Sequence, residues 1–430
     1  MSNEHLTRLM NETRSKPRLL VVVNNFPPDR GGGGAVYGDL CYSLVQRGFD
    51  VTVRCPYPFY PEWRDKSGRN GLTIWRYEDQ GVHVERFGIY IPSNPNSILQ
   101  RLLHDASLLL SLMRSIHRGR KFDVVMAYCP LVSGVAFSAL NRMVYRKPLW
   151  LNVQDLAAEA AAATGIVRHA WISKLLRGVQ RWLFNRADVW STISPMMIER
   201  LEPMRRRNQT LLLLPNWLNA SLASEIEKFK PGPQPRACHE PMRLLYAGNI
   251  GKKQNLLTLL KLLHESKAQF EFAVHGSGAQ ALAIERWVAN AGDARFRFGP
   301  FLDEAGFARM LSWTDFFVIS ETGDSGASFM PSKLVPGIAS GAPILAICDA
   351  DGPLGIEVRR HELGPWFSWA EASQIGELLS QLGQNRERFE HWSRRATLRA
   401  AEYDRDAIID RVAQDLRQLC SNAPVHEAVT

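Results

Sequence analysis

Short hydrophobic runs alternate with longer segments of helical periodicity along the chain. Leu19–Val23 is a continuous apolar run, which is typical of a parallel strand buried on both faces. A glycine-rich loop follows, and Ala35–Arg47 then has the period of an amphipathic helix that ends before Gly48. Val51–Arg54 is the next strand-like run. The N-terminal segment therefore predicts a strand–loop–helix–strand unit.

The alternation continues, breaks once and restarts. Before the break it predicts strands at Val82–Arg86, Asp123–Ala127, Leu149–Val153, Asp188–Ile193 and Leu211–Leu214, and helices at Ser97–His117, Leu131–Tyr145 and Trp171–Asn185. Lys228–Pro241 interrupts the pattern with four prolines, one glycine and no apolar period. After it come strands at Arg243–Ala247, Phe270–Val274, Arg295–Phe298, Asp315–Ile319 and Pro343–Ile347, helices at Asn255–His264 and Ala279–Asn290, and a largely helical stretch at Ala370–Leu419. A chain of 430 residues is too long to fold around one hydrophobic core, so two domains are expected. Because strands and helices alternate in both halves, we predict two successive Rossmann-like, doubly wound α/β domains.

Composition and charge narrow the class of protein. The chain is 45% hydrophobic and 22% charged, as in globular proteins, and its net charge of +9 favours an anionic partner. The six cysteines form no CxxC pair, which disfavours a zinc site and is typical of buried, reduced thiols. No signal peptide or spanning apolar run is visible. We therefore expect a cytoplasmic protein with no metal.

Glycine-rich loops supply the first candidate chemistry. Gly31–Gly34 lies between a strand and a helix, where backbone N–H groups can approach an anion. Gly248–Lys253 occupies the same kind of position in the second half of the chain, and its last lysine can reach a phosphate. Neither loop is a GxGxxG fingerprint, so a nicotinamide dinucleotide enzyme is disfavoured.

Three further segments have candidate roles, and each also has a plain structural interpretation. Pro331–Leu334 places Ser332 as a helix cap and Lys333 as a second cation for a diphosphate. Asn152–Leu156 places a carboxylate at the end of a strand, for sugar binding or proton transfer. Pro56–Trp63 offers aromatic faces for a sugar or lipid. The structural alternatives are an ordinary helix cap, a capping aspartate and a proline-stiffened loop.

The order and spacing of these segments resemble the retaining GT-B-fold glycosyltransferases, in particular the bacterial enzymes of exopolysaccharide and O-antigen assembly of the colanic-acid type. The matching segments run from about Arg18 to about Ala400 and are Asn24–Gly34, Pro58–Trp63, Pro92–Ser97, Val153–Leu156, Ser191–Pro195, Pro215–Trp217, Tyr246–Gln254, Gly276–Gly278 and Pro331–Leu334. The resemblance implies an N-terminal acceptor domain over 18–217, a nucleotide-sugar domain over 218–403, and a C-terminal helix and tail over 404–430 that cross back to the first domain. Residues 1–17 are then an N-terminal tail.

The resemblance also assigns roles to single residues, with the donor in the cleft between the domains. It implies donor contacts for Gly33, Gly34, Asn249, Lys253, Gly276, Gly278, Ser332 and Lys333, with Lys253 neutralising the diphosphate leaving group. Asp155 is implied as a catalytic cleft residue, and Gln154, Tyr60 and Trp63 are acceptor-side candidates. The donor would be a UDP- or GDP-linked sugar and the acceptor a glycan or a polyprenyl-diphosphate-linked saccharide. No cofactor and no nucleic-acid partner are expected.

One departure from the family pattern concerns the ribose site. Many relatives carry a pair of glutamates, the second of which binds ribose, but Ala327 and Val335 stand at the equivalent positions. Glu321 or Asp324 is the candidate replacement. The departure leaves open a divergent, non-catalytic protein that binds sugar nucleotides. An epimerase or a phosphorylase of the same double-Rossmann build also stays open, and a dinucleotide oxidoreductase is the least favoured alternative.

A membrane surface is a further candidate partner. The leucine-rich stretch Leu99–Met113 is followed or flanked by basic residues, namely Arg101, Arg114, Arg118, Arg120 and Lys121. Basic amphipathic helices lie on anionic membranes, so the pattern favours peripheral association with the inner face of the plasma membrane. A core-packed helix with basic ends explains the same pattern.

Overall fold

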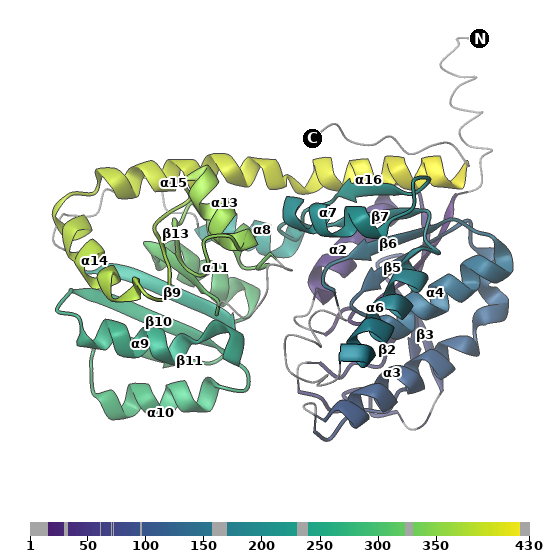
Figure 1. Cartoon of the computed structure of the whole chain (residues 1–430), viewed down its shortest axis with the longest axis horizontal. Coiled ribbons are helices and arrows are strands. Elements are labelled where there is room, and N and C mark those ends of the chain that lie inside the picture. Colours follow the sequence, from purple (N-terminus) through teal and green to yellow (C-terminus); the bar gives the residue numbers. More distant parts are fainter. Residues whose placement is uncertain are drawn as a thin grey trace, which may run out of the picture. The chain divides into compact units, whose positions relative to one another are not determined.

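The chain folds into two compact α/β units (Figure 1). The computed structural model describes residues 16–29, 33–60, 62–69, 71, 73–94, 97–156, 170–229, 240–322 and 330–421. The first unit runs to Leu214 and takes up the chain again at Asp406, and the second unit spans Pro215–Arg405. The pattern of alternating strands and helices predicted this fold class, and the structure confirms it.

An eight-stranded sheet forms the centre of the first unit. Its strands are β1 (Arg18–Val22), β2 (Asp50–Pro56), β3 (Ile74–Asp79), β4 (Val82–Phe87), β5 (Val124–Cys129), β6 (Leu149–Val153), β7 (Val189–Thr192) and β8 (Thr210–Leu213), in the order β3-β4-β2-β1-β5-β6-β7-β8. All neighbours are parallel except β3 and β4, which form an antiparallel hairpin at one edge. The carboxyl ends of the parallel strands therefore share one edge of the sheet.

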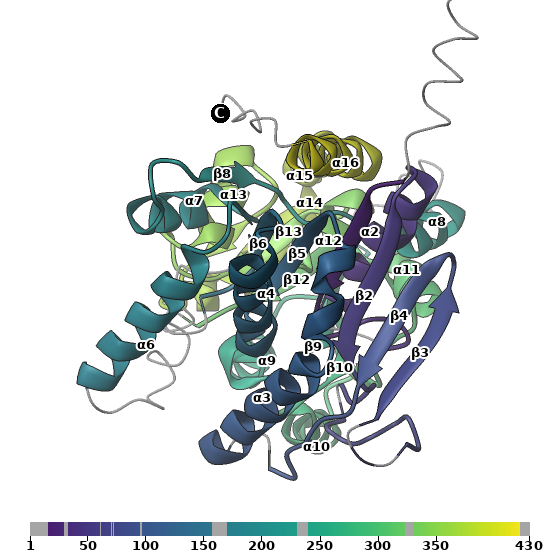
Figure 2. The ribbon, with the colours of Figure 1, turned by 90° about the vertical axis from the view of Figure 1, so that its right-hand side faces the viewer.

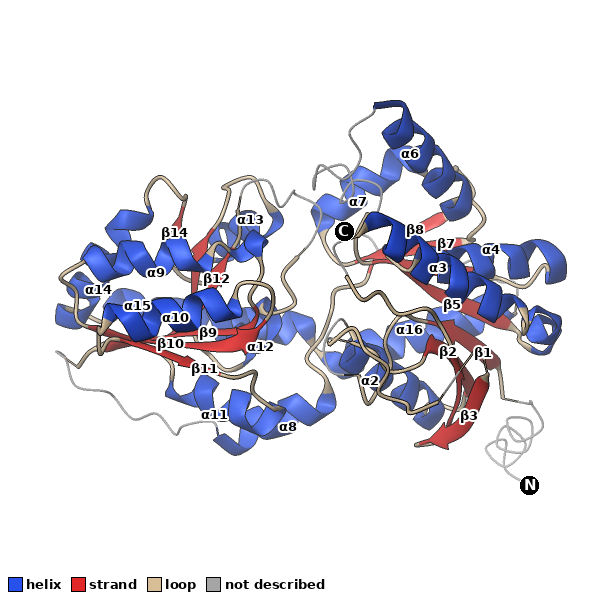
Figure 3. Ribbon diagram, turned by 90° about the horizontal axis from the view of Figure 1, so that it is seen from below, coloured by secondary structure: helices blue, strands red, loops and turns tan. Residues whose placement is uncertain are grey.

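Helices cover both faces of this sheet. They are α2 (Gly34–Gln46), α3 (Ile98–Met113), α4 (Val132–Tyr145), α6 (Ala170–Phe184), α7 (Pro195–Leu201) and α16 (Arg405–Cys420), with 3-10 turns η1 (Ile116–Lys121) and η2 (Glu202–Met204). The helices α3, α4 and α6 lie along one face, and α2 and α16 lie along the other (Figures 2 and 3). None of the described helices combines the length and the apolar character needed to cross a membrane.

The C-terminal helix α16 packs on the first unit, as the resemblance implied. Arg47 at the end of α2 forms ion pairs with Asp406 at 3.1 Å and with Asp410 at 2.6 Å. Arg417 donates to the Arg47 carbonyl oxygen at 2.6 Å, and its guanidinium lies 5.2 Å from the ring centre of Phe49. These contacts, together with the buried side chains along α16, attach the end of the chain to the N-terminal domain.

The second unit contains a six-stranded, fully parallel sheet. Its strands are β9 (Met242–Asn249), β10 (Phe270–Ser277), β11 (Phe296–Gly299), β12 (Phe316–Ser320), β13 (Ile344–Ile347) and β14 (Trp366–Phe367), in the order β11-β10-β9-β12-β13-β14. The helices are α8 (Ala220–Phe229), α9 (Leu256–Glu265), α10 (Ala281–Ala291), α11 (Glu304–Trp313), α12 (Leu334–Ala339), α13 (Pro353–His361), α14 (Ile375–Gln384) and α15 (Glu387–Ala400), with 3-10 turns η3 (Lys252–Gln254), η5 (Ala372–Gln374) and η6 (Ala401–Tyr403).

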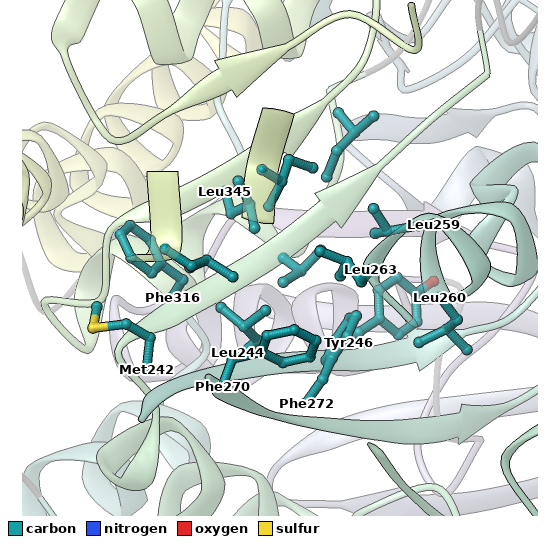
Figure 4. Close-up of a cluster of buried hydrophobic side chains, with 14 of the residues drawn as sticks. Met242, Leu244, Tyr246, Leu259, Leu260, Leu263, Phe270, Phe272, Phe316 and Leu345 are labelled. Atoms are coloured by element: carbon teal, nitrogen blue, oxygen red, sulfur yellow. The ribbon is translucent and has the colours of Figure 1, made fainter. Parts of the chain in front are cut away.

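Strand β9 separates two hydrophobic cores in this unit. Leu244 and Tyr246 point into the core formed with α9, α10 and α14, part of which is drawn in Figure 4. Leu245 and Ala247 belong to the core on the opposite face, with α8, α11 and α13. A strand buried on both faces in this way reads as one apolar run, which is why it was recognisable from the sequence.

Candidate functional site

Two glycine loops meet at the carboxyl ends of β9 and β10 in the second unit. The parallel register places Gly248 beside Gly276. A Cβ on Gly276 would lie 2.0 Å from the Gly248 carbonyl oxygen, and a Cβ on Gly278 would lie 2.6 Å from the Ile250 carbonyl oxygen. The loops thus pack backbone against backbone, and this close approach requires both glycines even before a ligand is considered.

Lys333 reaches from the segment before α12 to the end of β9. Its Nζ donates to the Tyr246 hydroxyl at 2.6 Å and lies 3.8 Å from the centre of that ring. The hydroxyl in turn donates to the Asn249 carbonyl oxygen at 2.5 Å. Gly248 has a φ of +128°, and a Cβ there would lie 2.7 Å from the Lys333 Cε. Position 248 therefore needs glycine both for its backbone conformation and for the lysine that passes over it.

Glu321 follows β12 at the same edge of the sheet and is only 9% exposed. Burial raises the pKa of its carboxyl to about 7, against the opposing effect of the positive charges on Lys333 and Lys253. Burial also lowers the pKa of Lys333 to about 7, and the negative charge of Glu321 opposes that shift. A lysine and a glutamate that both titrate near neutrality in one small region are typical of functional sites.

Hydrogen bonds to two backbone carbonyls hold the turn that carries Lys253 against the end of β12. The Lys253 carbonyl accepts the N–H of Thr322 at 2.7 Å, and the Ser320 hydroxyl donates to the Gln254 carbonyl at 2.7 Å. The Gln254 side chain accepts the N–H of Gly251 at 2.9 Å. The structure therefore brings Lys253, with its exposed side chain, together with Glu321 and Lys333, which the sequence had proposed separately.

The segment before α12 differs from the expectation in one respect. Lys333, not Ser332, occupies the N-cap position, and no side chain caps this short helix. The N–H of Leu334 donates instead to the Pro331 carbonyl at 3.0 Å, so a backbone turn satisfies a group that a capping serine would have accepted. The prediction that Ser332 caps α12 was wrong. Ser332 is exposed beside Lys333, and a ligand contact from it stays a prediction.

The structure describes one of the two positions, 327 and 335, at which many relatives carry glutamate. Val335 is buried within α12, so no polar group is available there. Ala327 and Asp324 lie outside the described residues. Glu321 is thus the carboxylate that the described structure offers at this edge for a ribose contact.

The glycine loop of the first unit leads into α2. Gly33 is the N-cap of α2 with a φ of +89°, and a Cβ there would lie 2.7 Å from the Tyr37 ring. A Cβ on Gly34 would lie 2.9 Å from the Asp29 carbonyl oxygen. Gly31 and Gly32 lie outside the described residues. The helix start at the carboxyl end of β1 presents first-turn N–H groups that have no partner within the helix, which is the arrangement an anion requires.

Gln154 and Asp155 stand just beyond the end of β6, on the same edge of the sheet. The Gln154 side chain donates to the Asn152 side-chain oxygen at 2.7 Å, and Asn152 donates to the Ser191 hydroxyl at 2.9 Å. The Asp155 carboxylate accepts the N–H of Leu156 at 2.7 Å. The network positions the Gln154 side chain, and the Asp155 carboxylate is held by the neighbouring backbone; contact of either side chain with a sugar stays a prediction.

Tyr60 and Trp63 belong to the loop after β2, which packs on α3. The Trp63 ring lies 5.7 Å from that of His104, and the Arg101 guanidinium lies 5.6 Å from the Trp63 ring centre. The Tyr60 carbonyl accepts from the Lys66 ammonium at 2.7 Å, and burial raises the pKa of the Tyr60 hydroxyl. Trp63 is thus held by α3, which matches the structural alternative for this loop. An acceptor contact from either residue stays a prediction.

Two polar features of these edges were missed from the sequence. Tyr246, in an otherwise apolar strand, supplies the hydroxyl that holds Lys333. In the first unit the fully buried Arg86 donates to the Phe26 carbonyl at 3.0 Å and lies 3.9 Å from the Asp29 carboxylate, whose pKa burial raises to about 6. In both cases a polar residue within a strand was the only sign in the sequence. The partners of that residue lie far away along the chain, so the sequence did not reveal the contact.

Comparison with known sequences identifies a domain and a relative. Residues 31–217, which make up most of the first unit, match the family model described as Glycosyl transferase 4-like domain. The protein named "Putative colanic acid biosynthesis glycosyl transferase WcaI" of Escherichia coli (strain K12) is 25% identical over 355 residues, covering 79% of this chain and 85% of that protein.

Comparison with solved structures identifies the fold. Sucrose-phosphate synthase from Thermosynechococcus elongatus has a TM-score of 0.71 at 14% identity, covering 95% of this chain and 100% of that chain. Anabaena Alr3699/HepE, solved in complex with UDP and glucose, has a TM-score of 0.65 at 14% identity and covers 94% of this chain and 100% of that chain. At these identities the likeness is one of fold, and it confirms the GT-B fold that the motifs implied.

Proposed function

We propose that this chain, a GT-B-fold protein whose residues 31–217 form a glycosyl transferase 4-like domain, moves a sugar from a nucleoside diphosphate sugar to a glycan or polyprenyl-diphosphate-linked saccharide. The observation that carries the proposal is the cluster of Lys253, Lys333 and Glu321 at the carboxyl ends of β9 and β12. Ligands of open parallel sheets bind at this edge. The name of the Escherichia coli relative points to bacterial surface polysaccharide synthesis, and UDP in HepE makes UDP-sugars the first donors to test.

The two lysines would act on the leaving group. As the bond between the sugar and the diphosphate breaks, negative charge develops on the diphosphate oxygens. Lys333, already held in place by Tyr246, stabilises that charge without reorganising, and the exposed Lys253 adds a second positive charge. In this scheme the two lysine cations take the place of a metal ion, so the proposed reaction needs no metal. Breaking the same bond releases the nucleoside diphosphate.

Glu321 would replace the glutamate that many GT-B relatives place at position 335. Its carboxyl oxygen accepts a hydrogen bond from a ribose hydroxyl in either protonation state. Its main chain is fixed, because its N–H donates to the Ile347 carbonyl at 2.8 Å and its carbonyl accepts the Trp369 indole N–H at 2.7 Å. A ribose contact from this position therefore needs no movement of the backbone.

The acceptor would bind on the first unit, near Gln154 and Asp155. The acceptor hydroxyl attacks the sugar on the face that the diphosphate leaves, which retains the anomeric configuration and requires no protein nucleophile. The departing diphosphate oxygen then accepts the hydroxyl proton. Asp155 and Gln154 orient sugar hydroxyls in this scheme, since their side chains are held at the end of β6.

We place the protein at the inner face of the plasma membrane, where a lipid-linked acceptor is found. On α3 four leucines, Leu99, Leu102, Leu103 and Leu110, are between 49% and 68% exposed. The opposite face of α3 is packed in the core through Leu108 and Leu112, so the four leucines form a separate exposed apolar face, which we propose as the surface that lies on the membrane.

A matched pair of variants tests the proposed reaction. Lys253→Ala should lower turnover by roughly 10²-fold or more at saturating UDP-sugar, because a group that stabilises the leaving group is lost. Lys252→Ala removes an equal charge from the neighbouring exposed position and should leave turnover within about twofold. The assay follows UDP release with a polyprenyl-diphosphate-linked acceptor, and NMR reports the anomeric configuration of the product.

Other outcomes of this assay would contradict the proposal in different ways. Equal turnover in Lys253→Ala and the native chain rules out the leaving-group role. Conversion of the donor to an epimer without an acceptor, or phosphate-dependent release, assigns the site to an epimerase or a phosphorylase. Donor binding with no turnover on any acceptor identifies a non-catalytic sugar-nucleotide-binding protein.

A further inference from the structure

A hollow of about 330 Å³ opens in the first unit at the amino ends of β7 and β8. The end of α4, the end of α6 and the turn before β8 form its walls. It lies at the opposite end of the strands from the glycine loop of this unit and from Asp155. None of the roles proposed above uses it.

The charges around this hollow do not balance. Arg142 is neutralised, because it makes two bonds of 2.9 Å to the Asp188 carboxylate. Arg146, Arg186 and Arg206 also line the hollow, and none of the three makes an ion pair in the part of the chain that the structure describes. The three guanidiniums therefore leave an excess of three positive charges. Like charges repel one another, and an anion bound in the hollow would offset that repulsion.

Two polar atoms in the wall also have no partner. Both atoms are buried: the Arg186 Nε donates no hydrogen bond and the Asn185 side-chain oxygen accepts none within the described residues. Guanidinium groups bind phosphate oxygens with paired N–H donors, so three of them around one hollow match a phosphate group.

The hollow adjoins an exposed apolar row on α6. Leu175, Val179 and Trp182 are 58%, 46% and 47% exposed, and their spacing places them on one helix face. The Arg186 guanidinium stacks 4.6 Å from the Trp182 ring centre, so the row leads directly to the hollow. On α4, Met143 lines the hollow and is 49% exposed.

The charged residues of α6 all have one sign. Lys174, Arg177 and Arg181 are exposed, and the helix contains no acidic residue. Tryptophan with flanking lysine and arginine is the combination that favours the interface between the headgroups and acyl chains of a bilayer. The charge is complementary to an anionic leaflet.

We propose that the hollow binds the phosphate of an anionic phospholipid headgroup while the apolar row of α6 enters the adjoining bilayer. This inference rests on the membrane location proposed above and gives it a defined contact. Arg146, Arg186 and Arg206 hold the phosphate, and Leu175, Val179 and Trp182 displace headgroup water.

The first test compares two neighbouring arginines in the full-length chain. Binding is measured by co-sedimentation with phosphatidylcholine vesicles that contain or lack phosphatidylglycerol. Arg206→Ala should weaken binding to the anionic vesicles by roughly tenfold or more, since a charge-assisted bond to phosphate is lost. Arg207→Ala removes the same charge from the same turn without lining the hollow, and general attraction to the surface limits its effect to about fivefold. Equal losses in the two variants would show that the hollow makes no specific contact.

The second test separates a lipid from a soluble phosphate compound. Trp182→Ser should weaken vesicle binding by roughly tenfold, while Leu282→Ser, an exposed leucine of the second unit, should have no effect. If glycerol 3-phosphate binds in an Arg206-dependent way but vesicles do not, a soluble phosphorylated ligand occupies the hollow and the membrane proposal is wrong. No binding to either probe also overturns it.

The proposed sugar transfer and the proposed lipid contact can be tested independently of each other. Stabilisation by UDP-sugars depends on the second unit, so Arg206→Ala and Trp182→Ser should leave it unchanged. Intact donor stabilisation without vesicle binding contradicts the inference and the proposed membrane location, but not the proposed reaction. Vesicle binding with no response to any nucleotide sugar contradicts only the proposed reaction.

Discussion

Donor binding should weaken steeply as the pH rises through neutrality. Burial lowers the pKa of Lys333 to about 7, so Lys333 is protonated in most molecules at pH 6 and in few molecules at pH 8.5. Glu321, whose pKa burial raises to about 7, gains its negative charge over the same range. Both changes make the site less attractive to a diphosphate, because the cation is lost and an anion appears.

The size of the effect follows from the fraction of charged Lys333. With a pKa of about 7, the protonated fraction falls from about 0.9 at pH 6 to about 0.03 at pH 8.5. If only the charged form binds, the association constant falls about 30-fold over this range, which corresponds to about 2 kcal/mol. Repulsion from ionised Glu321 adds to that loss. A bound diphosphate raises the pKa of Lys333, so binding at pH 7.5 takes up a proton.

Isothermal titration of UDP-glucose into the full-length chain at several pH values measures this dependence. Repeating the titration in two buffers of different ionisation enthalpy counts the protons taken up. Lys333→Gln should bind weakly, and its affinity should depend less on pH, with only the titration of Glu321 remaining. Lys252→Gln should bind like the native chain at every pH. An affinity that is equal at pH 6 and pH 8.5, or an unchanged pH profile in Lys333→Gln, would refute the reasoning.

Two further predictions concern glycine 248 and a buried ion pair. Gly248→Ala should reduce donor affinity by roughly tenfold or more and cost about 1–3 kcal/mol of unfolding free energy, because its φ of +128° is strained and its methyl group displaces Lys333. Gly292→Ala, with a φ of +60° and open space around it, controls for strain alone, and equal donor affinity in both variants would contradict the steric argument. Glu85→Ala leaves the fully buried Arg54 without its carboxylate and should cost about 3–5 kcal/mol in urea unfolding. Glu62→Ala, in an exposed pair, should cost less than about 1 kcal/mol, and similar losses in the two variants would argue against the burial effect.

The fold was predictable where strands are buried on both faces. The expected strand at Leu149–Val153 is β6 to the residue, and the run Leu19–Val23 differs from β1 by one residue at each end. The edge strand β3 was missed, because its residues are only partly buried and its two aromatic residues follow no long apolar run. Strand β14 is two residues long and leaves no periodic signal.

The candidate site was predictable in its parts but not in its contacts. Glycines after strands and lysines beside them indicated an anion site at Gly248–Lys253 and at Lys333. The bond between Lys333 and Tyr246 joins residues 87 positions apart, so no local pattern encodes it. The helix start near Ser332 was misplaced because a backbone turn to Pro331 competes with a side-chain cap, and the sequence does not distinguish them.

Thermal unfolding of the full-length chain with a panel of UDP- and GDP-sugars tests the central claim most directly. We expect at least one nucleotide sugar to raise the midpoint, since a ligand that binds only the folded state stabilises it. The same sugar should have no effect on the double variant Lys253→Ala, Lys333→Gln. The claim would be contradicted if no nucleotide sugar stabilised the native chain, or if the double variant responded as the native chain does.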